Sequence, residues 1–279
     1  MRRPIVRLSS LQLTNIKNVK KGTIYMPNTV NKILSADKAE ILGIYGQNGS
    51  GKTAIVDALY FLQKVMIGVD LDQSLEDYMD MDSDTAEIFA DFNIFMDDIV
   101  FEIGYRLSLS REEKEVVISR ETLSAAKNEN GIRTNKTVFM DYQRDQANAI
   151  FKPQKRLDEI LEENKEIKTD LIVARKMAEK SNCSYIFGES SREIFCREYK
   201  NGFQQFSVII ASLFEFALKD LFVIRNTHSG VISANFVLPM AFRIENDSIG
   251  AKGDFAVSLT EPILVDEERK NLLETIVEQ

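Results

Sequence analysis

The stretch "GIYGQNGSGKTAIVDALYFL", residues 43–62, carries the pattern that indicates both a fold and a chemistry. Gly46, Gly51, Lys52 and Thr53 fit the spacing G-x-x-x-x-G-K-[ST] of a phosphate-binding P-loop, or Walker A motif. Such a loop wraps backbone N–H groups around a phosphate chain, so glycines stand where a Cβ would block the approach. The lysine ammonium then meets the β- and γ-phosphates, and the threonine hydroxyl ligates Mg²⁺.

The flanking residues supply the context that such a loop needs. Residues 39–45, "AEILGIY", form a short apolar run that predicts a buried parallel strand. Residues 53–66 predict a helix whose N-terminus adds a favourable dipole for an anion. One face of this helix is predicted to contain Ile55, Ala58, Leu59, Leu62, Val65 and Met66. A strand before the loop and a helix after it favour a working P-loop over a glycine-rich turn that binds nothing.

Before and after this unit the sequence predicts strands. Residues 5–26 predict two strands, with Lys20, Lys21 and Gly22 as the turn between them, and residues 27–38 predict a polar connector. Residues 70–84 are rich in acids and predict a solvated surface. Residues 86–123 alternate apolar and polar side chains, which predicts an antiparallel meander with one wet face.

The second half of the chain predicts mainly helices. Residues 153–180 are charged with one apolar face, and residues 203–226 are strongly apolar and predict a core helix. Residues 230–244 predict one or two strands, and the last segment predicts a helix with acids in its first turn. We therefore expect three regions: strands and P-loop helix over 1–68, an antiparallel β lobe over 69–152, and a mainly helical region over 153–279.

Composition limits the classes of partner. The formal net charge of −8 over 279 residues argues against a chain that binds nucleic acid non-specifically. No apolar run approaches the roughly 20 residues of a membrane helix, so we expect a cytoplasmic protein. Cys183 and Cys196 lack the spacing of metal ligands, and with His228 as the single histidine they predict reduced thiols and a loop residue.

Two motifs together resemble the N-terminal portion of ATPases of the RecF/SMC/OLD type, the ABC-like "AAA family" proteins. Residues 15–19, "NIKNV", resemble the family's N-F-[KR]-[SN]-hydrophobic strand end, and residues 46–53 resemble its G-x-N-G-[SA]-G-K-[ST] loop. The resemblance implies an α/β P-loop NTPase of ABC/RecF type with an antiparallel β-meander and a helical insertion. It implies ATP and Mg²⁺ as cofactors, Lys52 and Thr53 as catalytic residues, and Thr53 as the metal ligand. The nucleotide-binding residues that it implies are Lys17, Asn18, Gly46, Asn48, Gly49, Ser50, Gly51, Lys52 and Thr53.

The same resemblance implies partners. In this family two protomers sandwich ATP, so a homodimer or a partner chain is expected to complete the site. The C-terminal ATPase lobe of the family has no counterpart in residues 1–279, and DNA is expected to bind through a partner or through that lobe. A role in DNA repair or in defence against phage and plasmids is what the resemblance implies for biology.

Three further parts of such an ATPase are a Q-loop glutamine, a signature helix and a Walker B strand ending in Asp-Glu. Gln143 and Gln146 are polar and central but read better as surface residues, and no signature is found. "ILVDEE", residues 263–268, resembles a Walker B segment with Asp266 and Glu267. The preferred interpretation is that these acids begin the final helix, where acids are common.

Two alternatives remain open. The chain can be a non-hydrolysing module that binds ATP for regulation or interaction, because the hydrolytic parts are doubtful or missing. It can also be a GTPase-like switch, since Asp247 and Gly250 match D-x-x-G, although no base-reading NKxD motif is present.

Overall fold

Period-two alternation of apolar residues builds the scaffold of this chain, a sheet of seven strands. The computed structural model describes residues 3–71, 73–112, 115–144, 146, 150–153, 155, 165–196, 204–226, 232–234, 242–245 and 248–251. The chain divides into two units, residues 1–214 and 215–279. The first unit contains the sheet and the P-loop.

The sheet is antiparallel throughout its pairings, in the order β2-β1-β3-β4-β5-β6, with β7 also paired to β5. Its strands are β1 (Ile5–Ile16), β2 (Val19–Tyr25), β3 (Thr85–Met96), β4 (Ile99–Arg111), β5 (Val116–Glu129), β6 (Ile132–Arg133) and β7 (Thr137–Gln143). The meander predicted over residues 86–123 is confirmed as β3, β4 and β5. Its predicted inward side chains are buried: Ile88, Ala90, Phe92, Ile94, Phe101, Ile103, Tyr105, Leu107 and Leu109.

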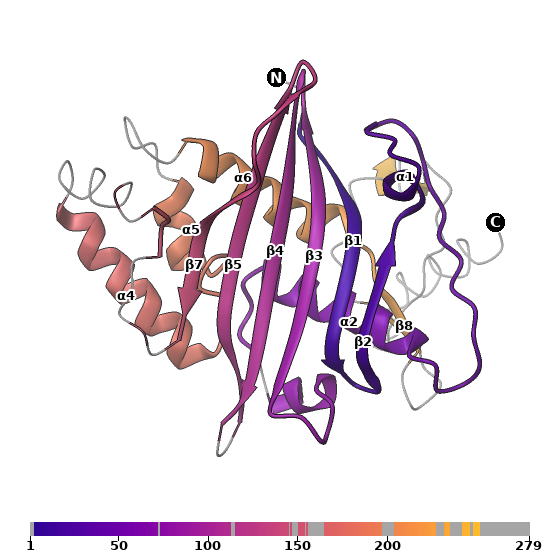
Figure 1. Cartoon of the computed structure of the whole chain (residues 1–279), viewed down its shortest axis with the longest axis horizontal. Coiled ribbons are helices and arrows are strands. Elements are labelled where there is room, and N and C mark those ends of the chain that lie inside the picture. The colour runs from indigo at the N-terminus through magenta and orange to yellow at the C-terminus, as the bar shows by residue number, and fades with distance from the viewer. Residues whose placement is uncertain are drawn as a thin grey trace. The chain divides into compact units, whose positions relative to one another are not determined.

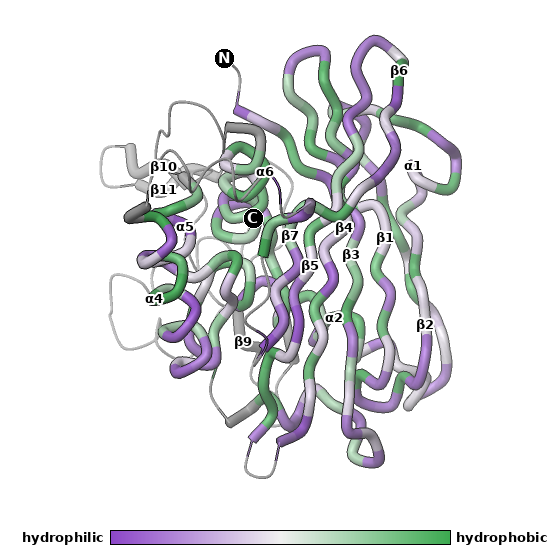
Figure 2. The backbone as a smooth tube through the Cα atoms, turned by 60° about the vertical axis from the view of Figure 1, so that its left-hand side comes forward, coloured by the Kyte–Doolittle hydropathy of each residue, from purple (hydrophilic) through white to green (hydrophobic). Residues whose placement is uncertain are grey.

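Helices cover one side of this sheet (Figures 1 and 2). They are α2 (Lys52–Met66), α4 (Lys165–Ser181), α5 (Glu189–Cys196) and α6 (Gln204–Glu215). The short helix α1 (Pro27–Val30) follows β2 at the edge of the sheet, and the 3-10 helix η1 (Gln73–Tyr78) precedes β3 (Figure 1). The Phe61 ring of α2 stacks on Tyr78 with centroids 5.0 Å apart, and Tyr142 of β7 stacks on Tyr185 at 5.0 Å. The first contact joins α2 to η1, and the second ties the loop after α4 to the sheet.

The second unit is small in its described part. After α6, residues Phe216–Asp220 form a π-helical turn, so the helix predicted over 203–226 ends earlier than expected. Two short antiparallel pairs follow, β8 (Ile224–Asn226) with β9 (Ile232–Ala234) and β10 (Phe242–Glu245) with β11 (Ser248–Ala251). The predicted final helix, with Asp266 and Glu267, lies outside the described residues.

The first hairpin turns earlier than the sequence predicts. Lys17 and Asn18 form the turn, because Ile16 pairs directly with Val19, while Lys20 to Gly22 continue as part of β2. Lys17 adopts φ of +49°, which is uncommon for a non-glycine residue. The prediction was wrong because a lysine-glycine run resembles a turn, whereas the two-residue turn at 17–18 carries no glycine.

The buried parallel strand predicted over residues 39–45 is also corrected. These residues form no strand, and Ile41 and Tyr45 are 92% and 94% exposed. A strand buried on both faces needs neighbours in a sheet. Among the described residues no strand pairs with this segment, and its apolar side chains are left at the surface.

The other local predictions hold in part. Helix α2 is confirmed, but its buried face is rotated toward Ala54, Asp57 and Phe61, while Ile55 and Leu59 are half-buried. In the acidic segment, surface exposure is confirmed for Glu76, Asp77, Asp82 and Asp84, whereas Leu75, Tyr78 and Met79 are buried beneath them. Of the helix predicted over 153–180, α4 confirms residues 165–180 with Ile167, Leu171 and Ala174 buried, and residues 156–164 lie outside the described part.

A buried glutamate holds the loop that follows α4 against the sheet. Glu121 Oε1 accepts hydrogen bonds from the Tyr105 hydroxyl at 2.5 Å and the Ser184 hydroxyl at 2.7 Å. Its Oε2 accepts from the backbone N–H of Tyr185 at 2.6 Å. Burial raises the pKa of Glu121, and these hydrogen bonds to the ionised form offset only part of that effect.

We predict that Glu121→Gln changes the pH dependence of stability. The folded chain holds the Glu121 proton to a higher pH than the unfolded chain, so between the two pKa values the folded state binds more protons. Relative to the glutamine variant, the wild-type free energy of unfolding should therefore fall as the pH rises above the ordinary value of 4.5. Urea denaturation of both proteins from acid to neutral pH measures this difference. Glu121→Ala serves as the contrast and should be less stable than Glu121→Gln by about 1–3 kcal/mol at every pH, because it leaves buried donors unpaired and does not titrate.

Candidate functional site

The P-loop of residues 46–53 leads directly into helix α2. Gly51 is the residue before the first helical turn and has φ of +88°, and Gly49 has φ of +82°. L-residues with a Cβ rarely adopt these values, which explains glycine at both positions. The loop and the first turn therefore have the backbone shape that the sequence motif requires.

The glycines are required for two different reasons. A Cβ on Gly51 would lie 2.5 Å from Val19 Cγ2, and a Cβ on Gly46 would lie 2.6 Å from Ser50 Oγ. A Cβ on Gly49 would meet nothing within 4 Å, so only its backbone conformation demands glycine. Gly51 and Gly46 are therefore required by close contacts with Val19 and Ser50, and Gly49 by its left-handed backbone.

The polar groups of the motif gather at the loop. The Lys52 ammonium donates to the carbonyl oxygens of Gly46 at 2.6 Å and Gln47 at 2.7 Å, and it lies 3.4 Å from Ser50 Oγ. Thr53 is exposed in the first turn of α2, and Asn48 is exposed in the loop. The structure thus places the predicted residues 46, 48–51, 52 and 53 in one loop and helical turn, with Gly51 buried, Lys52 half-buried and the others exposed.

The turn of the first hairpin lies against this loop. The Lys17 ammonium forms an ion pair with Asp57 of α2, and the Asn18 amide donates to the Gly49 carbonyl. Both residues thus contact the P-loop unit, although their contact with a nucleotide stays a prediction. Because a chain segment at 17–19 reaches residues 49–57, the nucleotide-binding unit is built from two parts of the sequence.

Asp57 is a site residue that the helix pattern did not reveal. Its side chain is 4% exposed, so an unpaired charge there would be costly, and the Lys17 ammonium supplies the compensating charge. The available signal was an aspartate placed five residues after Lys52 on the face that also buries Ala54, Ala58 and Phe61. Only the folded hairpin identifies its partner.

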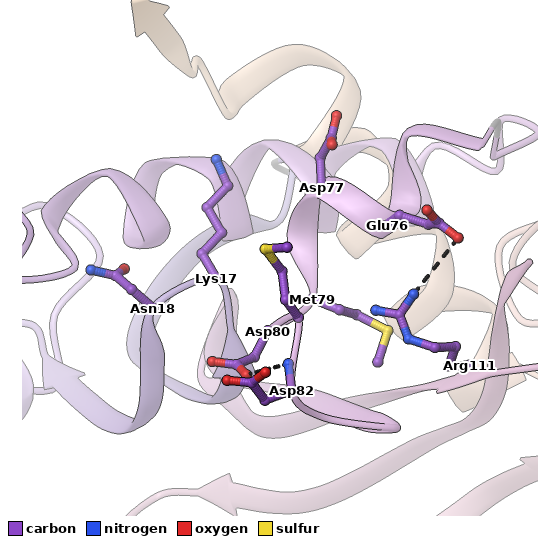
Figure 3. Close-up of a pocket in the computed structure, with 9 residues that line it drawn as sticks. Lys17, Asn18, Glu76, Asp77, Met79, Asp80, Asp82 and Arg111 are labelled. Carbon is purple, nitrogen blue, oxygen red and sulfur yellow. Dashed lines mark hydrogen bonds and ion pairs between the residues drawn. The ribbon is translucent and has the colours of Figure 1, made fainter.

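An open pocket of about 670 Å³ lies on the other side of the hairpin turn. Figure 3 shows Lys17 and Asn18 projecting from the turn at one side, with Asp80 and Asp82 close together. The Lys20 ammonium at 2.6 Å and the Asp82 backbone N–H at 3.0 Å hold the pKa of Asp80 below its usual range. The acidic side chain is thus neutralised in part by the hairpin itself.

The remaining candidate residues lie apart from the loop. Gln143 ends β7, where its carbonyl accepts from Arg175 at 2.5 Å, and Gln146 is exposed. Burial raises the pKa of the Cys183 thiol to about 11, which makes it a poor nucleophile or metal ligand at neutral pH. In the described parts of the chain, no cluster of three or more His, Cys, Asp or Glu side chains can hold a metal. His228, Asp247 and the side chain of Cys196 lie outside what the structure describes, and Gly250 lies in β11.

These features define the class: a P-loop nucleotide-binding domain in a mixed α/β chain with an antiparallel sheet. Residues 41–168 match the family model described as "AAA domain, putative AbiEii toxin, Type IV TA system". Over these residues the chain is therefore similar to an AAA domain of the AbiEii type. A search of the curated proteins found no match. Within the described helices, none has the length and apolar character needed to cross a membrane.

We predict that Gly51→Ala destabilises the folded chain more than Gly49→Ala. Both changes force an L-residue into a left-handed conformation, at a cost of about 1–2 kcal/mol. Gly51→Ala adds the overlap with Val19, which Gly49→Ala does not. Thermal unfolding followed by circular dichroism compares the two variants.

The clash is tested separately by the double variant Gly51→Ala with Val19→Ala. Removing the Val19 γ-carbons relieves the overlap but leaves the backbone strain, so part of the lost stability should return. If Val19→Ala only adds its own destabilisation to that of Gly51→Ala, the described contact is not the source of the cost.

Proposed function

We propose that this chain binds Mg·ATP through its P-loop and hydrolyses it when a partner chain or a further lobe completes the site. The observation that carries the proposal is the P-loop itself, with left-handed glycines at 49 and 51 and the Lys52 ammonium beside the loop carbonyls. The match of residues 41–168 to an AAA domain supports the same function. The loop lies exposed, which leaves room for a second surface to cover it.

Each residue of the loop has a separate role in this proposal. Lys52 would exchange the carbonyl oxygens of Gly46 and Gln47 for phosphate oxygens, which carry more negative charge. Thr53 would hold Mg²⁺ through its exposed hydroxyl, and the metal supplies neutralisation of phosphate charge when it is bound. The N-terminus of α2 adds backbone N–H groups and the positive end of its dipole.

A defence role is the biological part of the proposal. The matched family model carries the words AbiEii toxin and Type IV TA system, and toxin–antitoxin systems act in conflict between cells and foreign elements. We favour defence over DNA repair for this reason. A homodimer or a partner chain, with DNA bound through the partner, completes the assembly that we propose.

We predict that Lys52→Ala weakens the binding of Mg·ATP by about tenfold to a hundredfold. A charge-assisted hydrogen bond contributes about 1.5–3 kcal/mol, and each 1.4 kcal/mol is a factor of ten. Isothermal titration calorimetry on the purified chain measures the dissociation constant. Lys64→Ala, on the last turn of the same helix, is the matched control and should bind as the wild type does. Unchanged affinity in Lys52→Ala would contradict the proposal.

We predict that Thr53→Ala removes the dependence of nucleotide affinity on Mg²⁺. The hydroxyl is the metal ligand in the proposal, so the variant should bind ATP equally well with Mg²⁺ and with a chelator. The wild type should bind more tightly with the metal. A Mg²⁺ effect that persists in Thr53→Ala would place the metal ligand elsewhere.

We predict that ATP turnover by the purified chain depends on protein concentration or on an added partner. A site completed by a second surface is inactive when that surface dissociates, so dilute chain should show only background phosphate release. Glu267→Gln should then bind and turn over ATP as the wild type does, because we assign Glu267 to the start of the last helix. Turnover lost in Glu267→Gln would instead make "ILVDEE" a working Walker B segment.

A further inference from the structure

Three consecutive hairpin residues contact three parts of the P-loop unit. Lys17 pairs with Asp57 on α2, Asn18 donates to the Gly49 carbonyl, and Val19 packs where Gly51 lacks a Cβ. Residues 41–50 are otherwise exposed. The hairpin turn is therefore the part of the sheet that contacts the middle of the P-loop, at Gly49.

The Asn18 hydrogen bond sets the orientation of one peptide group. In a trans peptide the C=O and the following N–H point in opposite directions. Because the Gly49 carbonyl points to Asn18, the Ser50 N–H points away from the hairpin and donates a hydrogen bond to the Gln47 carbonyl of the same loop at 3.2 Å. The Gln47 carbonyl also accepts a hydrogen bond from the Lys52 ammonium at 2.7 Å, so the Ser50 N–H lies on the side of the loop that carries this cation.

Two hydrogen bonds therefore hold this peptide, and a phosphate that takes over the Ser50 N–H would leave only the one from Asn18. Gly49 has no Cβ and lies in open space, so its backbone can rotate with a small steric cost. A flipped 49–50 peptide would turn a carbonyl oxygen toward the inside of the loop. A phosphate chain would then meet a partial negative charge in place of an N–H donor.

The turn that carries Asn18 is itself fixed at its base. The Lys17 N–H donates to the Tyr78 carbonyl, and the Asp80 N–H donates to the Asn15 carbonyl, both at 2.9 Å. The ion pair with buried Asp57 ties the same turn to α2. Because the turn is held by these contacts, the Asn18 side chain has a defined position and can orient the more exposed P-loop.

We infer that Asn18 is a positioning residue for nucleotide binding, which orients the 49–50 peptide so that the Ser50 N–H faces the phosphates. This inference rests on the proposed ATP binding by the P-loop and goes beyond it by naming how the loop is held in its binding form. Asn18 acts through the loop backbone, and its effect does not require contact with the nucleotide.

The test compares Asn18→Ala and Asn18→Asp with wild type in the full chain. Asn18→Ala removes the donor without adding charge, and Asn18→Asp keeps the size but places an acceptor against the Gly49 carbonyl. Loss of one hydrogen bond predicts that the dissociation constant for Mg·ATP is about threefold to tenfold larger in Asn18→Ala than in the wild type. Asn18→Asp should lose more, because two acceptors repel. Position 18 is exposed and aspartate suits a turn as asparagine does, so the thermal midpoints should stay close to that of the wild type.

A spectroscopic measurement separates positioning from a general structural effect. In a nitrogen-15 amide spectrum of the nucleotide-free chain, the Ser50 signal should shift in both Asn18 variants. The matched control is Asn130→Asp, which adds the same charge in the exposed turn between β5 and β6, at the end of the sheet away from the P-loop. Its Ser50 signal and its affinity should equal those of the wild type.

The outcomes distinguish this inference from the proposed function. If wild type binds Mg·ATP and Lys52→Ala does not, the proposed function stands, and unchanged affinity in Asn18→Ala then overturns the positioning role alone. Weakening in Asn18→Asp but not in Asn18→Ala would also overturn it, since charge and not the hydrogen bond would be the cause. If the wild type binds no nucleotide, the proposed function fails, and the Ser50 shift still tests the orientation of the peptide.

Discussion

The antiparallel pairing of β1 with β3 is the constraint on which the site depends. Residues 5–14 pair with residues 87–95, so two strands far apart in sequence lie side by side. Everything between β2 and β3, including the P-loop and α2, is an excursion that leaves the sheet beside β2 and returns at β3 (Figure 1). Just before β3, a bridge between Ile16 and Met79 fastens this segment to the first hairpin. The bridge helps to keep the hairpin turn beside α2.

Because of this arrangement, the loop is held by side chains and not by a ladder of strand hydrogen bonds. In the described residues the segment before the loop has no strand partner, and its apolar side chains are exposed. The hairpin compensates with one ion pair and one amide hydrogen bond, from Lys17 and Asn18. The side of the P-loop that faces away from the hairpin stays exposed, and the proposed partner surface would cover it there.

The sequence predicts well those features that depend on near neighbours. The meander follows from period-two alternation, and α2 follows from a helical repeat after a glycine-rich loop, and both are found. The turn at Lys17 was misplaced because the run from Lys20 to Gly22 resembles a turn. The ion pair with Asp57 was not foreseen because it joins residues 40 apart along the chain. Strand β7 and the network around Glu121 were missed for the same reason. The buried strand over 39–45 was predicted from its own residues alone, yet burial of a strand is a property of its neighbours.

Buried carboxylates show how distant parts of the first unit are joined. Asp57 connects α2 to the first hairpin, and Glu121 connects β5 to the loop after α4. That loop also reaches the far end of α2, since a Cβ on Gly68 would lie 2.3 Å from the Phe187 carbonyl. Helix α2 therefore has the hairpin turn near one end and the loop from the helical region at the other. The N-terminus of the same helix carries Lys52 and Thr53, so α2 joins the first hairpin, the P-loop and the helical region in one continuous element.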